Sequence, residues 1–287
     1  MKVKKPMFVL GIGAQKAGTT WLHEALSSSP DANFGPLKEY HILDAVHLET
    51  SRSHRVNLIE RVAEKLNWSQ SKNDIVSLRY RMQRSTKTYA TEFSNYLSNG
   101  ATWTADITPA YSGLSHEVFE DVDREFSNLG IEVKIIFLMR DPVERLKSQV
   151  RMRRNFRKTN STGDLQEFSE ELKEFLDYDI PYQRGDYSRI VNSSVRAFGS
   201  DRVFFGLFET IFSTYEIDRL QQFLCRQFPI PDFSNKVNAS GSNLQIDTEL
   251  EKEIAKRFES SYKSAAEIFG VDEILKQWGS AENILAP

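Results

Sequence analysis

The chain has 287 residues, of which 40% are hydrophobic, which is enough apolar sequence for one domain spanning residues 1–287. Its 37 basic and 40 acidic residues give a formal net charge of -3, so no global excess indicates a nucleic-acid or membrane-surface partner. The single cysteine, Cys225, excludes an internal disulfide and a thiolate-rich metal site, and its apolar neighbours predict a buried thiol. No apolar window approaches the length of about 18 residues that a spanning helix needs, and we expect a cytoplasmic protein.

Strands and helices are predicted to alternate along the chain. Met7–Ile12 is an apolar run that precedes helical spacing from Trp21 onward. Val133–Met139 is a second apolar run and leads into a helix that begins at Pro142. Asp201–Phe208 is a third strand candidate. This alternation predicts an α/β fold with three layers, in which helices cover both faces of a central, mainly parallel sheet.

Four further segments complete the predicted organisation. Helices are expected at Tyr187–Phe198 and Tyr215–Phe228, on either side of the third strand. Glu249–Phe269 is predicted to form one amphipathic helix. Residues 51–99 are charged and weakly periodic, which is typical of surface helices and loops; we interpret them as a helical insertion or as a segment on the acceptor side of the site.

A glycine-rich segment lies between the first predicted strand and the first predicted helix. In this position, backbone N–H groups and the helix N-terminus form an anion site, and glycines allow close approach. Gly13 and Gly18 have the spacing of a nucleotide P-loop, but Thr19 occupies the position of its lysine and Lys16 lies inside the loop. A nucleoside triphosphate site needs that lysine on the β and γ phosphates, so a different phosphate chemistry is indicated.

The same segment resembles the 5′-phosphosulfate loop of sulfotransferases that use 3′-phosphoadenosine 5′-phosphosulfate (PAPS). The resemblance implies that Lys16 contacts the bridging oxygen and stabilises the leaving phosphate, so that the reaction requires no metal. It further implies a P-loop-like fold. The residues implied to bind the donor in this loop are Gln15, Lys16, Ala17, Gly18, Thr19, Thr20 and Trp21.

A second phosphate site is predicted after the second strand. Arg140 stands at the strand end, and Ser148 follows eight residues later in the next helix. A guanidinium stays charged and binds a phosphate through two N–H groups. The R-x-P-x-x-R-x-x-S pattern resembles the 3′-phosphate site of the same family. The heparan sulfate group also has a C-terminal Lys-Gly-Arg loop around the nucleotide. The lysine and arginine are missing here, and the residues expected to bind through amides and hydroxyls are Ser240, Gly241 and Ser242.

The segment from Lys38 to Asp44 reads K-E-x-H-x-x-D and resembles a segment of glycan sulfotransferases, including the heparan sulfate group. The resemblance implies that Glu39 is the general base that receives the acceptor proton. In the aryl and steroid branch a histidine has this role, so His41 is the second candidate. The resemblance implies that His41 and Asp44 flank the base, and Lys38 and Asp44 are expected to contact the acceptor.

Two weaker resemblances concern the acceptor. The stretch around Thr108 resembles a family segment near the acceptor, but Ile107 replaces the lysine that is frequent there, which indicates an acceptor less anionic than heparan sulfate. Arg184-Gly-Asp-Tyr187 resembles an R-G-x-Y element that precedes a long helix, and Tyr187 is expected to contact the cofactor or the acceptor.

These resemblances imply sulfuryl transfer from PAPS to a hydroxyl or amine of an acceptor, with 3′,5′-adenosine bisphosphate (PAP) as the product. A carbohydrate is the expected acceptor. The disulfide usual in Golgi members is impossible with Cys225 alone, so a bacterial-type cytoplasmic member is indicated. Three alternatives stay open: a P-loop kinase of a small metabolite, transfer to a small alcohol or phenol, and a non-catalytic binder that keeps the fold. The sequence does not indicate an oligomeric state.

Overall fold

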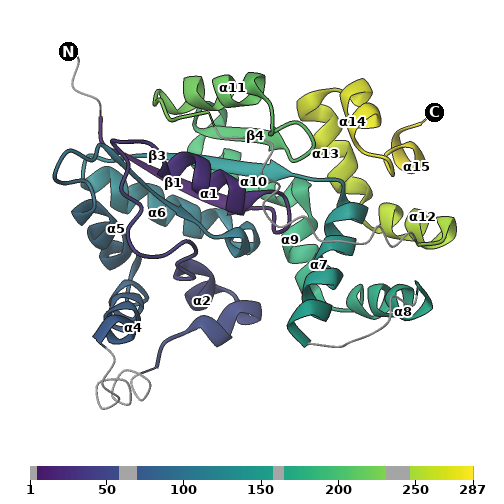
Figure 1. Cartoon of the computed structure of the whole chain (residues 1–287), viewed down its shortest axis with the longest axis horizontal. Coiled ribbons are helices and arrows are strands. Elements are labelled where there is room, and N and C mark those ends of the chain that lie inside the picture. Colours follow the sequence, from purple (N-terminus) through teal and green to yellow (C-terminus); the bar gives the residue numbers. More distant parts are fainter. Residues whose placement is uncertain (1–4, 58–69, 158–164, 231–245, 287) are drawn as a thin grey trace.

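The computed structural model contains one parallel sheet surrounded by helices (Figure 1). The structure describes residues 5–57, 70–157, 165–230 and 246–286. The strands of the described sheet are β1 (Met7–Gly13), β2 (Trp103–Ile107), β3 (Glu132–Met139) and β4 (Val203–Leu207). Their order is β2-β1-β3-β4, and every neighbouring pair is parallel. The predicted donor-loop residues Ser240, Gly241 and Ser242 lie outside the described residues.

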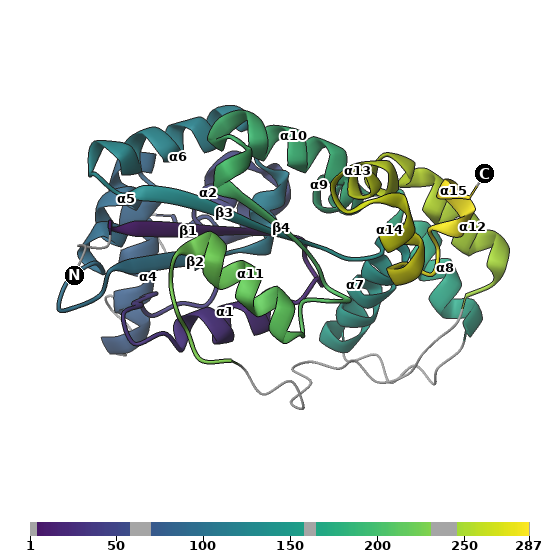
Figure 2. The same cartoon turned by 90° about the horizontal axis from the view of Figure 1, so that it is seen from above.

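Helices cover both faces of the sheet, as Figure 2 shows. Helices α1 (Thr19–Ser27) and α11 (Thr214–Leu224) lie on one face, and α6 (His116–Asn128) and α10 (Tyr187–Phe198) lie on the other. All seven residues of β1 are buried, which is the pattern of a parallel strand covered on both sides. The predicted three-layer α/β fold is confirmed, and so are the three strands that the apolar runs predicted.

Further helices gather beyond the carboxyl ends of the strands in both views (Figures 1 and 2). They are α7 (Pro142–Arg157), α8 (Leu165–Phe175), α9 (Asp179–Gly185), α12 (Thr248–Arg257), α13 (Glu259–Phe269), α14 (Val271–Gln277) and α15 (Glu282–Leu285). The prediction of one helix over Glu249–Phe269 is wrong, because the helix is interrupted at Phe258 between α12 and α13. That ring is buried and stacks on Tyr182 of α9 at a centroid distance of 5.4 Å, so tertiary packing divides the helix.

The segment between β1 and β2 contains short helices, several of which lie below the sheet in Figure 1. They are α2 (Leu43–His47), η1 (Glu49–His54), α4 (Gln70–Met82) and α5 (Thr86–Asn95). The interpretation of residues 51–99 as surface structure holds only in part. Helix α5 buries Tyr89, Ala90 and Phe93, and both aromatic rings pack against Phe8 of β1. The second half of the segment therefore belongs to the core.

The thiol of Cys225 is exposed, and the prediction that it is buried is wrong. Helix α11 ends at Leu224, and Cys225 adopts the left-handed conformation (φ 52°) as its C-cap. This turn points the side chain away from the core, whereas Leu224 remains buried. The apolar residue beside Cys225 in the sequence is therefore part of the core, but the thiol is not.

Strand β2 was not predicted, because polar residues interrupt its apolar pattern. Asp106 is fully buried near its carboxyl end and accepts hydrogen bonds from three hydroxyl groups. The donors are Tyr89 (2.9 Å), Tyr111 (2.7 Å) and Thr108 (2.6 Å). Burial raises the pKa of Asp106 to about 6, although these donors oppose the shift. Tyr111 and Thr108 lie in and just before the short helix η2 (Pro109–Gly113).

The same hydroxyl groups hold the segment that contains His41. The Tyr40 amide donates to the Thr108 hydroxyl (3.0 Å), and the Ile42 amide donates to the Tyr111 hydroxyl (3.1 Å). His41 lies between these two anchors with φ at 53°, a region that residues with a side chain rarely adopt. We call Asp106, Thr108 and Tyr111 the hydroxyl clamp. It fixes the backbone on either side of a candidate catalytic residue.

We expect Asp106→Ala to loosen this segment, because it removes the acceptor of three buried hydroxyl groups. The free energy of unfolding should fall by at least about 2 kcal/mol, measured by urea denaturation. The amide hydrogens of Tyr40 and Ile42 should also exchange faster in hydrogen-exchange mass spectrometry. Asp121→Ala, which removes an exposed partner of Arg124, is the control and should change stability by less than about 1 kcal/mol. Unchanged exchange at Tyr40 and Ile42 would contradict the clamp.

Candidate active site

The predicted phosphate loop and Arg140 lie at the carboxyl ends of the neighbouring strands β1 and β3. The chain continues from β1 to its neighbour β2 and later returns to β3, which lies on the opposite side of β1. The topological switch point of the sheet therefore lies between β1 and β3. Ligands of open α/β sheets bind outside the strand ends at such points. A hydrogen bond from the Ala14 amide to the Leu138 carbonyl (2.7 Å) joins the two ends.

The backbone of the loop has the conformation of an anion site. Gly13, Lys16 and Gly18 all have positive φ, at 129°, 71° and 84°. Gly18 is the N-cap of α1 and forms no side-chain cap hydrogen bond. A helix N-terminus without a side-chain acceptor can bind an anion through its amide groups, and the helix dipole favours negative charge there.

Arg140 contacts the phosphate loop directly. Its Nη1 donates to the Lys16 carbonyl (3.0 Å), and its guanidinium lies over the Phe208 ring at 4.4 Å. The Tyr187 hydroxyl donates to the Arg140 carbonyl (2.7 Å) and fixes the strand end. Ser148, in α7, is 3% exposed, and no described residue is a hydrogen-bond partner of its hydroxyl. The structure thus joins the two predicted phosphate sites into one region.

Basic side chains lie close together in this region, and Glu144 is the carboxylate beside Arg140 that also acts on Arg151. Burial lowers the pKa of the Lys16 ammonium, and repulsion by Arg140, Arg151 and Lys38 lowers it further. Within the described residues, Lys16 and Arg151 form no ion pair, and the nearest carboxylate to Arg140 is that of Glu144, at 4.0 Å. The Nε of Arg151 is buried and has no hydrogen-bond partner. These residues fit a ligand with several negative charges.

The candidate base is connected to the phosphate loop. Lys38 donates to the Thr20 hydroxyl (2.6 Å), and its Nζ lies 3.3 Å from Oε1 of Glu39. The other carboxylate oxygen of Glu39 lies 3.3 Å from Nε2 of His41. Arg79 of α4 donates to the Glu39 carbonyl (3.1 Å) and supports the backbone at this position. The structure therefore brings the predicted loop and the predicted base together.

The protonation of His41 separates the two candidate bases. Burial opposes charge on the ring, but hydrogen bonds to Asp44 (2.8 Å) and Glu39 outweigh it and raise the His41 pKa to about 9. Burial also opposes the charge of Glu39, but the contacts with His41 and Lys38 outweigh it and lower the Glu39 pKa. At neutral pH the imidazole is therefore protonated and cannot accept a proton, whereas Glu39 is an ionised carboxylate.

Three of the predicted acceptor contacts lie beneath the surface. Asp44, Thr108 and Tyr187 are all 0% exposed, and each has its hydrogen bond within the protein. Asp44 contacts His41, Thr108 belongs to the hydroxyl clamp, and Tyr187 contacts the Arg140 carbonyl. Lys38 is 40% exposed and Glu39 is 31% exposed, so these two side chains remain open to a ligand.

An aromatic group beside the phosphate loop was not predicted from the sequence. The rings of Phe208 and Phe212 lie 5.2 Å apart, and Phe212 lies 5.1 Å from Trp21. Phe212 is 37% exposed, so part of this aromatic group faces solvent. The position of Phe208 could have indicated this group from the sequence, because it is the last residue of the third predicted strand and strand ends border the sites of this fold.

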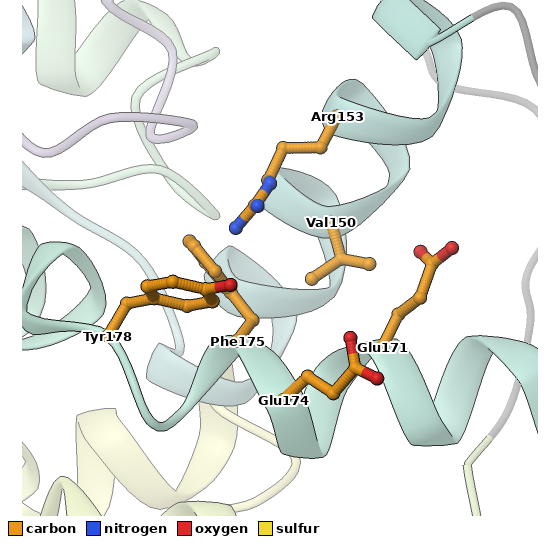
Figure 3. Close-up of a pocket in the computed structure, with 6 residues that line it drawn as sticks. All are labelled: Val150, Arg153, Glu171, Glu174, Phe175 and Tyr178. Carbon is orange, nitrogen blue, oxygen red and sulfur yellow. The ribbon is translucent and has the colours of Figure 1, made fainter.

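A small pocket between α7 and α8 lies elsewhere (Figure 3). Its lining residues are Val150, Arg153, Glu171, Glu174, Phe175 and Tyr178. The Arg153 guanidinium lies 4.4 Å from the centroid of the Phe175 ring, a cation–π contact that joins the two helices. At about 100° per residue, Val150 and Arg153 face away from Ser148 on α7, so this pocket is not part of the candidate site.

Neither a metal site nor a membrane-spanning helix is found in the part of the chain that the structure describes. No group of three or more His, Cys, Asp or Glu side chains in that part of the chain has an arrangement that would hold a metal ion. None of the helices described has the length and apolar character needed to cross a membrane.

Comparisons with known proteins identify the family. The model of the Sulfotransferase family matches residues 6–205, well over half of the chain. A sulfotransferase structure from Alicyclobacillus acidocaldarius is 21% identical, with a TM-score of 0.56 over 93% of this chain and 96% of that one. A sulfotransferase domain from the curacin biosynthetic pathway is 14% identical, with a TM-score of 0.50 over 91% and 92%. Both likenesses show the fold, and no curated protein matches. The chain therefore belongs to the sulfotransferase family and is an enzyme of sulfuryl transfer.

Proposed function

We propose that this enzyme transfers a sulfuryl group from PAPS to a hydroxyl of a carbohydrate in the cytoplasm and releases PAP. The observation that supports this most strongly is the hydrogen bond between Arg140 and the Lys16 carbonyl, which joins two cationic sites at adjacent strand ends. A donor with separate 3′ and 5′ anionic groups requires two such sites. Family membership supports the choice of sulfuryl donor, because sulfotransferases generally use PAPS.

Each phosphate of the donor has a proposed set of partners. The amides and hydroxyls of Gly18, Thr19 and Thr20 bind the 5′-phosphate at the start of α1. Arg140 and Ser148 bind the 3′-phosphate, which distinguishes PAPS from ATP. The negative charge of the donor offsets the repulsion among Lys16, Arg140 and Arg151, in addition to Glu144, which lies beside Arg140 and acts on Arg151.

The reaction proceeds by in-line attack of the acceptor oxygen on sulfur. The new O–S bond forms as the bond from sulfur to the bridging phosphate oxygen breaks, and the electron pair leaves with PAP. Lys16 stabilises the charge that develops on the bridging oxygen. Glu39 accepts the acceptor proton, which need not be transferred fully before the sulfuryl group moves, by analogy with loose phosphoryl transfer.

The accessible residues around Glu39 favour a carbohydrate over a phenol. Lys38 is exposed on one side of the carboxylate, and the protonated ring of His41 lies on the other. Polar and charged groups of this kind pair with the several hydroxyls of a sugar, whereas an aryl acceptor needs an apolar pocket. The K-E-x-H-x-x-D segment that resembles the glycan sulfotransferases consists of these same residues.

We expect PAP to stabilise the enzyme without Mg²⁺. In a thermal-shift assay, PAP at about 100 times its dissociation constant should contribute about 2.7 kcal/mol, which corresponds to several degrees. Lys16→Ala and Arg140→Ala should each weaken PAP binding by at least about 10-fold, because each removes a charged hydrogen-bond donor. Arg124→Gln, an exposed residue of α6, removes the same charge away from the strand ends and should leave binding unchanged. Stabilisation by Mg·ATP alone would support a P-loop kinase instead.

We expect Glu39→Gln to bind PAP normally but to lose transfer by about 10² to 10⁴-fold, because it removes the general base. The assay follows labelled sulfate from PAPS into fractionated cell extract.

Wild-type transfer should fall as pH rises through about 9, where His41 loses the proton that holds the Glu39 carboxylate. His41→Asn should lack this alkaline limb. If the limb persists in that variant, it belongs to another group such as Lys16; if transfer rises through pH 9, His41 is the base.

A further inference from the structure

Arg184 of α9 contacts the phosphate loop from a distant part of the chain. Its Nη1 donates to Oε1 of Gln15 at 2.6 Å, and Gln15 is the residue that precedes Lys16. The guanidinium therefore lies beside the loop that holds the candidate catalytic lysine.

A chain of hydrogen bonds fixes the contact between Arg184 and Gln15. Gln149 of α7 donates to the same Oε1 of Gln15 (2.8 Å), and Nη1 of Arg145 donates to Oε1 of Gln149 (3.1 Å). Arg145 is fully buried, and its Nη2 also donates to the Pro181 carbonyl (3.1 Å) in α9. This chain connects α7, α9 and the phosphate loop, so Arg184 is held in a defined place.

Gly185 explains how this arrangement packs. A Cβ at this position would overlap Nη2 of Arg145 and would lie 2.8 Å from the Phe258 ring. The glycine next to Arg184 therefore lets the buried Arg145 guanidinium pass beneath α9. This is a physical reason for the Arg-Gly pair in the R-G-x-Y element.

The guanidinium of Arg184 has capacity for a further ligand. It offers five N–H donors, yet its hydrogen bond to Gln15 is the one found among the described residues, and no described carboxylate pairs with it. Among the described residues, none of its nitrogens is a fully buried atom that lacks a partner. Burial lowers the Arg184 pKa, which indicates a guanidinium partly removed from water before any ligand binds.

Helix α9 also borders the candidate base. Gln183, the neighbour of Arg184, accepts a hydrogen bond from Thr50 of η1 (2.7 Å), and the ring of His54 in η1 stacks on His41 at 3.8 Å. The charges of Asp44 and Glu39 act on Arg184. The segment that contains Arg184 is therefore connected to the donor loop through Gln15 and, through η1, to the segment of the proposed base.

We propose that Arg184 is a catalytic residue that binds the non-bridging oxygens of the sulfuryl group as it passes from donor to acceptor. The inference rests on the proposed function, because it places a sulfuryl group between Lys16 and Glu39. A planar guanidinium matches two oxygens of such a group, and its charge stabilises them without accepting a proton. Lys16 then acts on the leaving oxygen, Glu39 on the acceptor proton, and Arg184 on the group that moves.

The test compares PAP, which lacks the sulfuryl group, with PAPS in binding and turnover. For Arg184→Gln, we expect PAP affinity within about 3-fold of wild type, weaker PAPS binding, and PAP release from PAPS slowed by about 10² to 10³-fold, as when one preorganised donor is removed. Arg184→Lys keeps the positive charge but lacks the planar pair of N–H donors, and it should recover part of the rate. Arg124→Gln is the matched loss of one exposed charge and should behave as wild type.

Two results would overturn the inference. Equal weakening of PAP and PAPS in both Arg184 variants would show that the residue only positions Gln15 in the phosphate loop. Unchanged turnover in both variants would show that it does not touch the moving group. Wild-type protein that binds neither nucleotide would instead refute the proposed function, and the role of Arg184 with it.

Discussion

The candidate site depends on the positive charge that gathers at the carboxyl ends of β1 and β3. Lys16, Arg140 and Arg151 repel one another there, and burial keeps water from screening the repulsion fully. The fold tolerates this because buried neighbours hold the backbone: Tyr187 fixes the end of β3. An anion bound there would be attracted by all three side chains.

The candidate base belongs to a second buried network that does not share this charge. Asp106 at the end of β2 organises the hydroxyl clamp, and the clamp fixes the amides on either side of His41. Lys38 then connects this network to the donor loop through the Thr20 hydroxyl. The candidate donor and acceptor residues are thus held at three neighbouring strand ends, β2, β1 and β3.

The sequence predicted the parts of this fold whose signals are local. Met7–Ile12 and Val133–Met139 are apolar throughout, so the strands and the loop after the first of them could be identified from neighbouring residues. Strand β2 was missed because Asp106 breaks its apolar pattern. The carboxylate accepts a hydrogen bond from Tyr89, which lies in helix α5. Spacing also could not show that His41 is protonated, because its pKa depends on burial and on Asp44. The contact of Arg184 with Gln15 spans 169 residues and has no local signal.

The exposed Cys225 has a practical consequence for the study of this enzyme. Its neighbour Arg226 donates to the Lys5 carbonyl just before β1, so the cysteine lies at the amino ends of the strands, on the edge of the sheet opposite the charged site. As the chain's one sulfhydryl, it is a native attachment point for a fluorophore or spin label. A label attached there needs no new mutation and does not occupy the site.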